Sequence, residues 1–349
     1  MYFDQKKKIV FFLFSKFNKC KMLLNQFSPV NLSQSHKTIL FVFAGRQEYM
    51  KILIRYLRKE LENKTLSEVH LWDMCGKHIE NRKYLNTLEG NGVKIMRDKR
   101  MLEGPGYKNR WNLAYQYYLE NCKDDDILIK CDDDIVYIKN LIHLVNYTKS
   151  KEKIGLVYPN IINNDAAAWV QLKKGMINVD PKRCTKIGQK IKDAGWGSSH
   201  ATAKWAKQGN VLSDWYRRKD CADWAFDEFL ANPSSFELDE VYTWDVPQRV
   251  SINMFCARGN HFKEIVKWFL SHKTKDDEHF LSFRYHRNNK KQKDIEYAMV
   301  LNSVVVHHSF RPQKIDKQES RRFEFLAPLS EAQEVSLQRF ERMSLQTRH

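Results

Sequence analysis

Glycine and proline are scarce in this chain of 349 residues, which has 13 glycines and 8 prolines. Such low numbers leave little room for long flexible linkers and exclude a collagen-like repeat. Hydrophobic residues make up 42% of the chain, which excludes a disordered protein. The apolar run 9–14 is much shorter than the roughly twenty residues of a membrane span, and short for a signal-peptide core. We therefore expect a soluble globular protein with one large domain or two closely packed ones.

Paired cysteines are also missing. The chain has seven cysteines, an odd number, and no C-x-x-C motif. This pattern supports neither a zinc ribbon, nor a redox motif, nor a disulfide framework. We expect most of the thiols to be small buried hydrophobic groups in a reducing compartment, which predicts a cytoplasmic location.

Basic residues exceed acidic ones, with 59 Lys and Arg against 42 Asp and Glu, a net charge of +17. This surplus favours anionic partners such as phosphorylated small molecules, acidic lipids or nucleic acid. Residues 1–37 contain seven lysines and one aspartate, and we expect a basic, poorly ordered arm there. The alternative is that this arm makes peripheral contact with the inner face of a membrane.

Strand-like and helix-like patterns alternate from residue 38 to residue 160. Apolar runs of strand length occur at 39–43, 69–72, 93–96, 127–129 and 154–158, and helical spacing occurs at 50–61, 111–118 and 141–145. Alternation of this kind predicts an α/β fold with a Rossmann-type, mainly parallel sheet flanked by helices. We assign 38–160 to a nucleotide-sugar-binding half.

The pattern changes after residue 160, and six of the nine tryptophans lie between 169 and 244. We expect 161–315 to be an irregular, aromatic-rich acceptor and catalytic half of the same domain. Within it, a helix is predicted from about Glu278 and a strand at 303–306. Residues 316–349 are predicted to form a helical tail.

Two acidic triplets lie on either side of the strand in KDDDILIKCDDDIVYI. The first triplet, 124–126, precedes the strand and is expected to be a solvated loop, whereas the second, 132–134, follows it. Ligands of open α/β sheets bind beyond the carboxyl ends of the strands. In an extended segment Asp132 and Asp134 share one face, while Asp133 points away. Two such carboxylates suit Mg²⁺ or Mn²⁺ with positions left open for phosphate oxygens.

Five segments together resemble the nucleotide-sugar glycosyltransferases of the GT-A fold. FVFAGR, EVHLWDMC and IKCDDDIVYI resemble the first, second and fourth strands of such enzymes, with a DxD-type motif. TKDDEHFLSF resembles the acidic motif that starts a helix and carries the base in inverting members. VVVHHSFRPQ resembles the late strand that delivers a histidine to the metal. The resemblance spans about 38–315 as short motifs in the right order.

This resemblance implies a metal-dependent transfer of a sugar from a nucleoside diphosphate to a hydroxyl, with inversion, in surface glycan or capsule synthesis. Asp132 is implied to contact the donor's ribose or the metal, and Asp134 to bind the metal, with Asp133 beside them in the donor site. His307 or His308 would complete the metal's shell, and the alternative is one core and one surface histidine.

An inverting transferase needs one carboxylate to accept the proton of the attacking hydroxyl. The resemblance places it at Asp276, Asp277 or Glu278, and we favour Asp277. Acidic residues at a helix start also act as N-caps and interact favourably with the helix dipole, so a purely structural role is the alternative.

Donor contacts are expected at the strand ends and at one helix start, from Ala44, Gly45, Arg46, Asp73, Lys108 and Arg110. Glycine permits close backbone approach, and basic residues at a helix N-terminus form an anion site. The chain has neither the Rossmann glycine fingerprint nor a Walker A motif, which disfavours a P-loop NTPase. On the acceptor side we expect Trp215, Trp244 and Asn253, with simple core packing as the alternative for each tryptophan.

Two other functions remain open from the sequence. A metal-dependent nucleotidyltransferase would use the same carboxylates but release pyrophosphate. A basic nucleic-acid-binding protein would use the positive charge and the aromatics. The basic residues of this chain are widely spread, however, and it has no helix-turn-helix, RNA-recognition or zinc signature. We expect a nucleotide-sugar donor and a glycan or glycolipid acceptor as partners, and no nucleic acid.

Overall fold

The computed structural model describes residues 36–98, 110–177, 219–244, 249–272, 276–293, 295–309 and 313–329. Residues from Lys37 onward belong to one compact unit, and the fold below is that of this unit. None of the helices in these described ranges combines the length and the apolarity needed to cross a bilayer.

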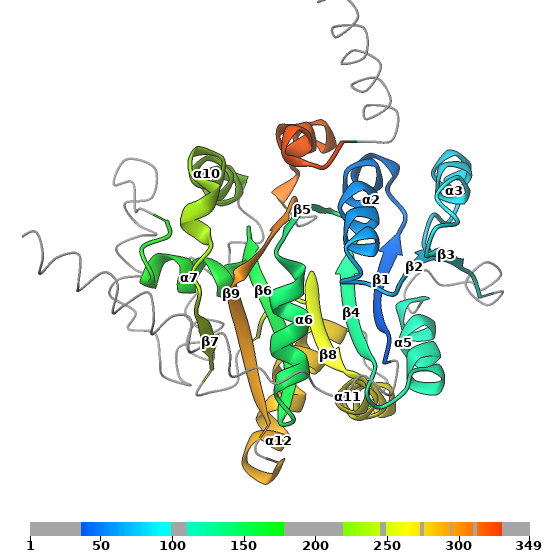
Figure 1. Ribbon diagram of the computed structural model, residues 1–349, viewed down its shortest axis with the longest axis vertical. Coiled ribbons are helices and arrows are strands. Elements are labelled where there is room, and N and C mark those ends of the chain that lie inside the picture. Colours follow the sequence, from blue (N-terminus) through cyan, green and yellow to red (C-terminus); the bar gives the residue numbers. More distant parts are fainter. Residues whose placement is uncertain are drawn as a thin grey trace, which may run out of the picture. The chain divides into compact units, whose positions relative to one another are not determined.

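A nine-stranded sheet runs through the unit in the order β3-β2-β1-β4-β8-β6-β9-β5, with β7 paired to β9 (Figure 1). Its strands are β1 Thr38–Ala44, β2 Glu68–Asp73, β3 Val93–Met96, β4 Ile127–Asp132, β5 Ile135–Lys139, β6 Ile154–Ile162, β7 Val241–Thr243, β8 Met254–Arg258 and β9 Glu296–His307.

The sheet is mixed, whereas the sequence predicts a mainly parallel one. Strands β3, β2, β1 and β4 are parallel neighbours, as expected for the first half of the chain. Strand β8 then lies antiparallel between β4 and β6, and β5 and β7 run antiparallel to β9. The difference arises because the second half, predicted to be irregular, contributes three strands to the same sheet.

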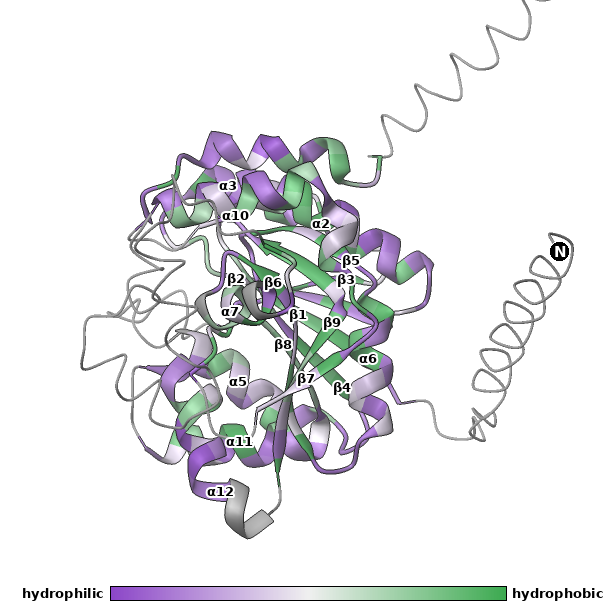
Figure 2. Ribbon diagram, turned by 90° about the vertical axis from the view of Figure 1, so that its left-hand side faces the viewer, coloured by the Kyte–Doolittle hydropathy of each residue, from purple (hydrophilic) through white to green (hydrophobic). Residues whose placement is uncertain are grey.

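Helices cover both faces of the sheet: α2 and α6 lie against one face, and α5 and α11 against the other (Figures 1 and 2). The helices are α2 Gln47–Glu62, α3 Ile79–Asn86, α5 Arg110–Asn121, α6 Leu141–Ser150, α7 Asp165–Lys173, α10 Lys219–Ala231, α11 Gly259–Ser271 and α12 Tyr285–Lys293. A π-helical turn, His279–Arg284, leads into α12, and Pro233–Phe236 and Lys317–Leu326 are 3₁₀-helical.

Alternating side chains of β1 pack into both layers. Phe41 stacks on Tyr118 of α5 with ring centroids 4.4 Å apart and meets Phe262 of α11 edge-on. Its neighbours Leu40 and Val42 are fully buried and, because side chains alternate along a strand, point to the opposite face. The five cysteines in the described ranges are buried, as expected.

One edge of the sheet gathers the polar segments predicted to be functional. Four strands end at this edge, namely β1, β4, β6 and β9, and two begin there, namely β5 and β8. The pairing of the strands shows this: Cys131 pairs with Met254, Ile135 with His307 and Ile162 with Val306. The residues just beyond these strand ends therefore lie close together, although they come from parts of the chain far apart in sequence.

The first acidic triplet lies in a loop at the opposite edge, as predicted, but its third carboxylate is not solvated. Asp126 is buried, and its carboxylate accepts hydrogen bonds from Lys37 N (2.9 Å) and Lys123 N (2.8 Å). Its carbonyl accepts one from Gly259 N at 2.7 Å. Asp126 thus connects the beginnings of β1, β4 and α11.

This connection depends on glycine at position 259. A Cβ there would lie 1.9 Å from Lys123 O, so the backbone must shift to accept any other residue. We expect Gly259→Ala to lower the free energy of unfolding by at least about 2 kcal/mol, measured by urea denaturation. Asn260→Ala, at the next, exposed position, is the control and should change it by less than about 0.5 kcal/mol. Equal stability of both variants would contradict the close contact.

Candidate functional site

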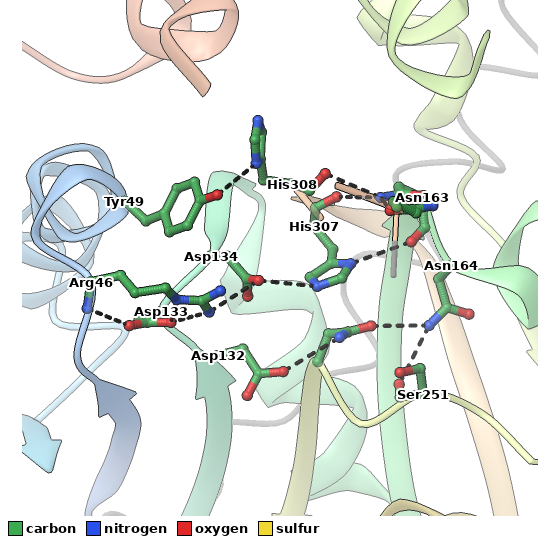
Figure 3. Close-up of polar contacts among 12 residues, drawn as sticks. Arg46, Tyr49, Asp132, Asp133, Asp134, Asn163, Asn164, Ser251, His307 and His308 are labelled. Atoms are coloured by element: carbon green, nitrogen blue, oxygen red, sulfur yellow. Dashed lines mark hydrogen bonds and ion pairs between the residues drawn. The ribbon is translucent and has the colours of Figure 1, made fainter. Parts of the chain in front are cut away.

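The second acidic triplet is a turn and not an extended segment. Strand β4 ends at Asp132, and Asp133 and Asp134 form the turn into β5. The turn places Asp133 and Asp134 together, beside Arg46, and separates both from Asp132 (Figure 3). This differs from the prediction that Asp132 and Asp134 converge, which assumed that the strand continues through the triplet.

Asp133 joins the triplet to the loop between β1 and α2. Its Oδ2 accepts hydrogen bonds from the backbone N–H groups of Gly45 and Arg46, both at 2.8 Å, and its Oδ1 accepts from Arg46 Nε at 2.8 Å. The Arg46 guanidinium also forms an ion pair with Asp134 at 3.0 Å and lies over the ring of Tyr49. Burial opposes ionisation of Asp134, but the charges of Arg46 and His307 hold its pKa well below the usual range.

His307 is the histidine of the pair that faces the triplet. Its Nε2 lies 3.4 Å from Asp134 Oδ2, and its Nδ1 lies 3.4 Å from the carbonyl of Asn163. His308 points the other way, toward Tyr49 Oη at 3.1 Å, and its ring stacks on Phe226. Burial lowers the pKa of His308 to about 4, so this ring is neutral near pH 7.

Asp132 lies on the face of the sheet covered by α5 and α11, next to a buried lysine. The ammonium of Lys130 forms an ion pair with Asp132, donates to Ile252 O at 2.6 Å and lies over the Phe43 ring. Lys130 is almost completely buried, whereas the Asp132 side chain is 27% exposed. The lysine therefore neutralises Asp132 from inside while part of the carboxylate stays open to solvent.

Buried amides connect Asp132 to the neighbouring strand ends. Asn253 Nδ2 donates to Asp132 at 3.4 Å, and Asn164 Nδ2 donates to Asn253 Oδ1 at 3.3 Å (Figure 3). Asn164 also accepts a hydrogen bond from Ala167 N in the first turn of α7. Neither Lys130 nor Asn164 was singled out in the sequence, because an isolated lysine in a strand and an Asn-Asn pair carry no motif.

The acidic segment 276–278 starts the helical stretch that leads into α12, as predicted, and its first and third carboxylates share Arg249 as a partner. Asp276 accepts from His279 N at 2.9 Å, which is an N-cap contact, and it faces Arg249 at 3.4 Å. Glu278 accepts from Arg249 Nε at 2.9 Å and from Ser251 Oγ at 2.7 Å.

Asp277 is the carboxylate of this segment whose surroundings best suit a general acid or base. It accepts hydrogen bonds from Tyr115 Oη at 3.2 Å and from Glu278 N at 3.0 Å. Burial raises the pKa of Asp277 to about 6, against the opposing charge of Lys130 and with the help of Asp132. A carboxylate with such a pKa is ionised at neutral pH and still basic enough to accept a proton.

A divalent cation would find few ligand atoms among the described residues of the site. Asp134 Oδ1 is buried without a hydrogen-bond partner, and with His307 Nε2 it offers two ligand atoms. The remaining carboxylates already face Arg46 and Lys130. Within the described ranges no group of three or more His, Cys, Asp or Glu residues is arranged to bind a metal. These residues therefore do not form a ready divalent-cation site.

Several predicted contact residues already have partners inside the chain. Ala44 is buried at the end of β1, and Asp73 accepts hydrogen bonds from Cys75 N and from Arg82 Nε at 2.9 Å. Trp244 is buried and packs edge-on against Tyr158 and Tyr242, which matches core packing. Arg110 begins α5. Lys108, Trp215, residues 1–35 of the basic arm and the tail from residue 330 lie outside the described residues.

The raised pKa of Asp277 predicts how stability depends on pH. The folded-state pKa, about 6, lies above the ordinary value of 3.8, so the native state binds the extra proton and loses stability as pH rises through 6. We expect Asp277→Asn to raise the free energy of unfolding at pH 7.5 by about 1–2 kcal/mol, with a smaller gain at pH 5.

The measurement is urea denaturation at both pH values, with Asp276→Asn as the matched control. Asparagine caps helices as well as aspartate does, so this exposed neighbour should show no comparable gain. A destabilised Asp277→Asn at pH 7.5 would contradict the assigned environment.

Comparisons with known proteins identify no family. No family model and no curated protein matches the chain. Among solved structures, the mannose-6-phosphate isomerase from Helicobacter pylori is 11% identical and covers 79% of this chain and 98% of its own, with a TM-score of 0.32. The apo form of mouse xyloside xylosyltransferase 1 is 8% identical and covers 75% of this chain and 84% of its own, with a TM-score of 0.30. Both are enzymes by name, and neither similarity is high enough to carry a functional conclusion.

Proposed function

We propose that this chain transfers a glycosyl group from a nucleoside-diphosphate sugar to a hydroxyl acceptor, with inversion. The observation that carries this proposal is the position of Asp277, a carboxylate with a pKa near 6 beside Lys130 and Asp132 at the carboxyl edge of β1 and β4. Ligands of open α/β sheets bind at this edge. The resemblance of the acidic segments to those of GT-A glycosyltransferases supports the same assignment.

Donor binding is assigned to the residues around the second triplet, with the ribose at Asp132 and the phosphates at Arg46. Asp132, which is partly exposed, accepts a hydrogen bond from a ribose hydroxyl, and Lys130 and Asn253 set its orientation. Arg46 follows β1 at the same edge, and its guanidinium suits a phosphate oxygen. His307 and Asp134 lie next to this position and complete its polar wall.

Asp277 is assigned the role of general base. Its carboxylate takes the proton from the acceptor hydroxyl while the hydroxyl oxygen bonds to the anomeric carbon of the donor. The bond from that carbon to the diphosphate oxygen breaks, and its electron pair leaves with the nucleoside diphosphate. Attack opposite the leaving group inverts the anomeric configuration. Tyr115 and the N–H of Glu278 orient the carboxylate for this step.

The acceptor is proposed to be a glycan or a glycolipid. The basic arm over residues 1–37 would bring the enzyme to lipid-linked acceptors at an anionic membrane surface. Flotation with vesicles containing phosphatidylserine tests this part, and unchanged flotation after deletion of residues 1–35 would count against it.

Nucleotide binding is the first test of the proposed activity. Thermal unfolding with UDP, GDP or CDP should show a rise in midpoint with at least one of them, because a ligand at about 100 times its Kd adds about 2.7 kcal/mol. Asp132→Ala should abolish the rise, whereas Asp125→Ala, in the first triplet at the opposite edge of the sheet, should preserve it. A rise with oligonucleotide and with none of these nucleotides would favour a nucleic-acid-binding protein instead.

The pH dependence of transfer tests the role of Asp277. We expect the rate to rise with pH around a midpoint near 6, because the base must be ionised. Asp277→Asn should lower the rate by about 10²–10⁴-fold. Tyr115→Phe removes the hydroxyl that stabilises the ionised carboxylate, so its midpoint should move to higher pH.

Tyr117→Phe, two positions further along α5, is the control and should leave the midpoint unchanged. Steady-state rates between pH 5 and 8 measure these shifts. An Asp277→Asn variant with wild-type rates would exclude this carboxylate as the base.

A further inference from the structure

The second acidic triplet is paired with two cationic side chains of the same chain. Lys130 contacts Asp132, and Arg46 contacts both Asp133 and Asp134, so two positive side chains face three carboxylates before any ligand binds. We propose that Arg46 takes the place of a divalent cation at the donor phosphates, so that the nucleoside diphosphate binds without added metal. The proposal rests on the glycosyl-transfer function above and deepens it.

Arg46 is firmly fixed at this position. Its backbone N–H and that of Gly45 bind one oxygen of Asp133, and its Nε binds the other, all at 2.8 Å. A divalent cation shared by the triplet would have to displace the guanidinium, and Asp133, only 4% exposed, would lose the hydrogen bond that Arg46 Nε now donates to its Oδ1. Breaking such a buried pair on one side is strongly unfavourable.

The guanidinium still has donors to offer a ligand. The Arg46 side chain is 39% exposed, and none of the described residues accepts a hydrogen bond from its Nη1. Arginine binds phosphate through two parallel N–H groups in a fixed plane. Tyr49, whose ring lies 4.9 Å from the guanidinium carbon, restricts the orientation of that plane.

Lys130 compensates the negative charge of Asp132, which would otherwise repel the phosphates. It is 3% exposed and therefore acts from inside the protein, with Asp132 and the carbonyl of Ile252 as its partners. The carboxylate nearest the open part of the site is thus neutralised by the chain itself. A metal ion is not needed to lower the negative charge there.

The test is the Kd of UDP, GDP and CDP, measured by calorimetry in EDTA and again with Mn²⁺. We expect the best of the three to bind with the same Kd in both buffers, within about threefold. Mn²⁺ alone, titrated into the protein and followed by electron paramagnetic resonance, should show no saturable site.

Variants of Arg46 separate its role from that of a metal ligand. Arg46→Gln should raise the Kd at least about tenfold, and Mn²⁺ should not restore it. Arg46→Lys keeps the charge that Asp133 needs and loses the planar fork, so it should fold and still bind more weakly than the wild type. Lys263→Met breaks an ion pair with the first triplet at the opposite edge and should leave the Kd unchanged.

The possible outcomes are distinct. Binding that appears only with Mn²⁺ would overturn this inference and leave the proposed function in place. Unchanged Kd values in both folded Arg46 variants would overturn it as well. If none of the three nucleotides binds in either buffer, the proposed function itself fails.

Discussion

Burial of the Asp133 carboxylate is the constraint on which the site depends. A buried carboxylate must be compensated by hydrogen bonds and opposite charge, and here all of these come from the loop that follows β1, through Gly45 and Arg46. The contact fixes the end of β4 against the beginning of α2. It also brings the guanidinium to Asp134, which in turn faces His307 at the end of β9. Three strand ends are thereby held in one polar cluster.

The triplet divides the site between the two faces of the sheet. Asp133 and Asp134 lie with Arg46 on the side of α2, while Asp132 and Lys130 lie on the side of α5 and α11. The second side contains the base candidate, because Tyr115 of α5 reaches Asp277. The phosphate position that we propose at Arg46 and the base candidate Asp277 therefore lie on different sides of the triplet.

Much of the first half of the fold could be predicted from the sequence, and less of the second. The run at 39–43 is apolar throughout and a helical pattern follows it, so its strand was predicted to within one residue, and the short run at 93–96 was predicted with the observed bounds. No predicted helix precedes β5, β7 or β8, so the alternation of strands and helices did not indicate them, and all three were missed. Asp277 and His307 were predicted to be site residues because they stand in recognisable segments. The contact between Tyr115 and Asp277 spans 162 residues, and no local pattern could have indicated it.

The central claim is that a nucleotide-sugar donor binds across the second acidic triplet. A crystal structure with a bound nucleoside diphosphate measures this most directly. The account predicts the diphosphate within hydrogen-bond distance of Arg46, the ribose at Asp132, and an open path from the terminal phosphate to Asp277. A nucleotide bound elsewhere, such as in the groove lined by Tyr56, Lys139 and Pro328, would contradict it.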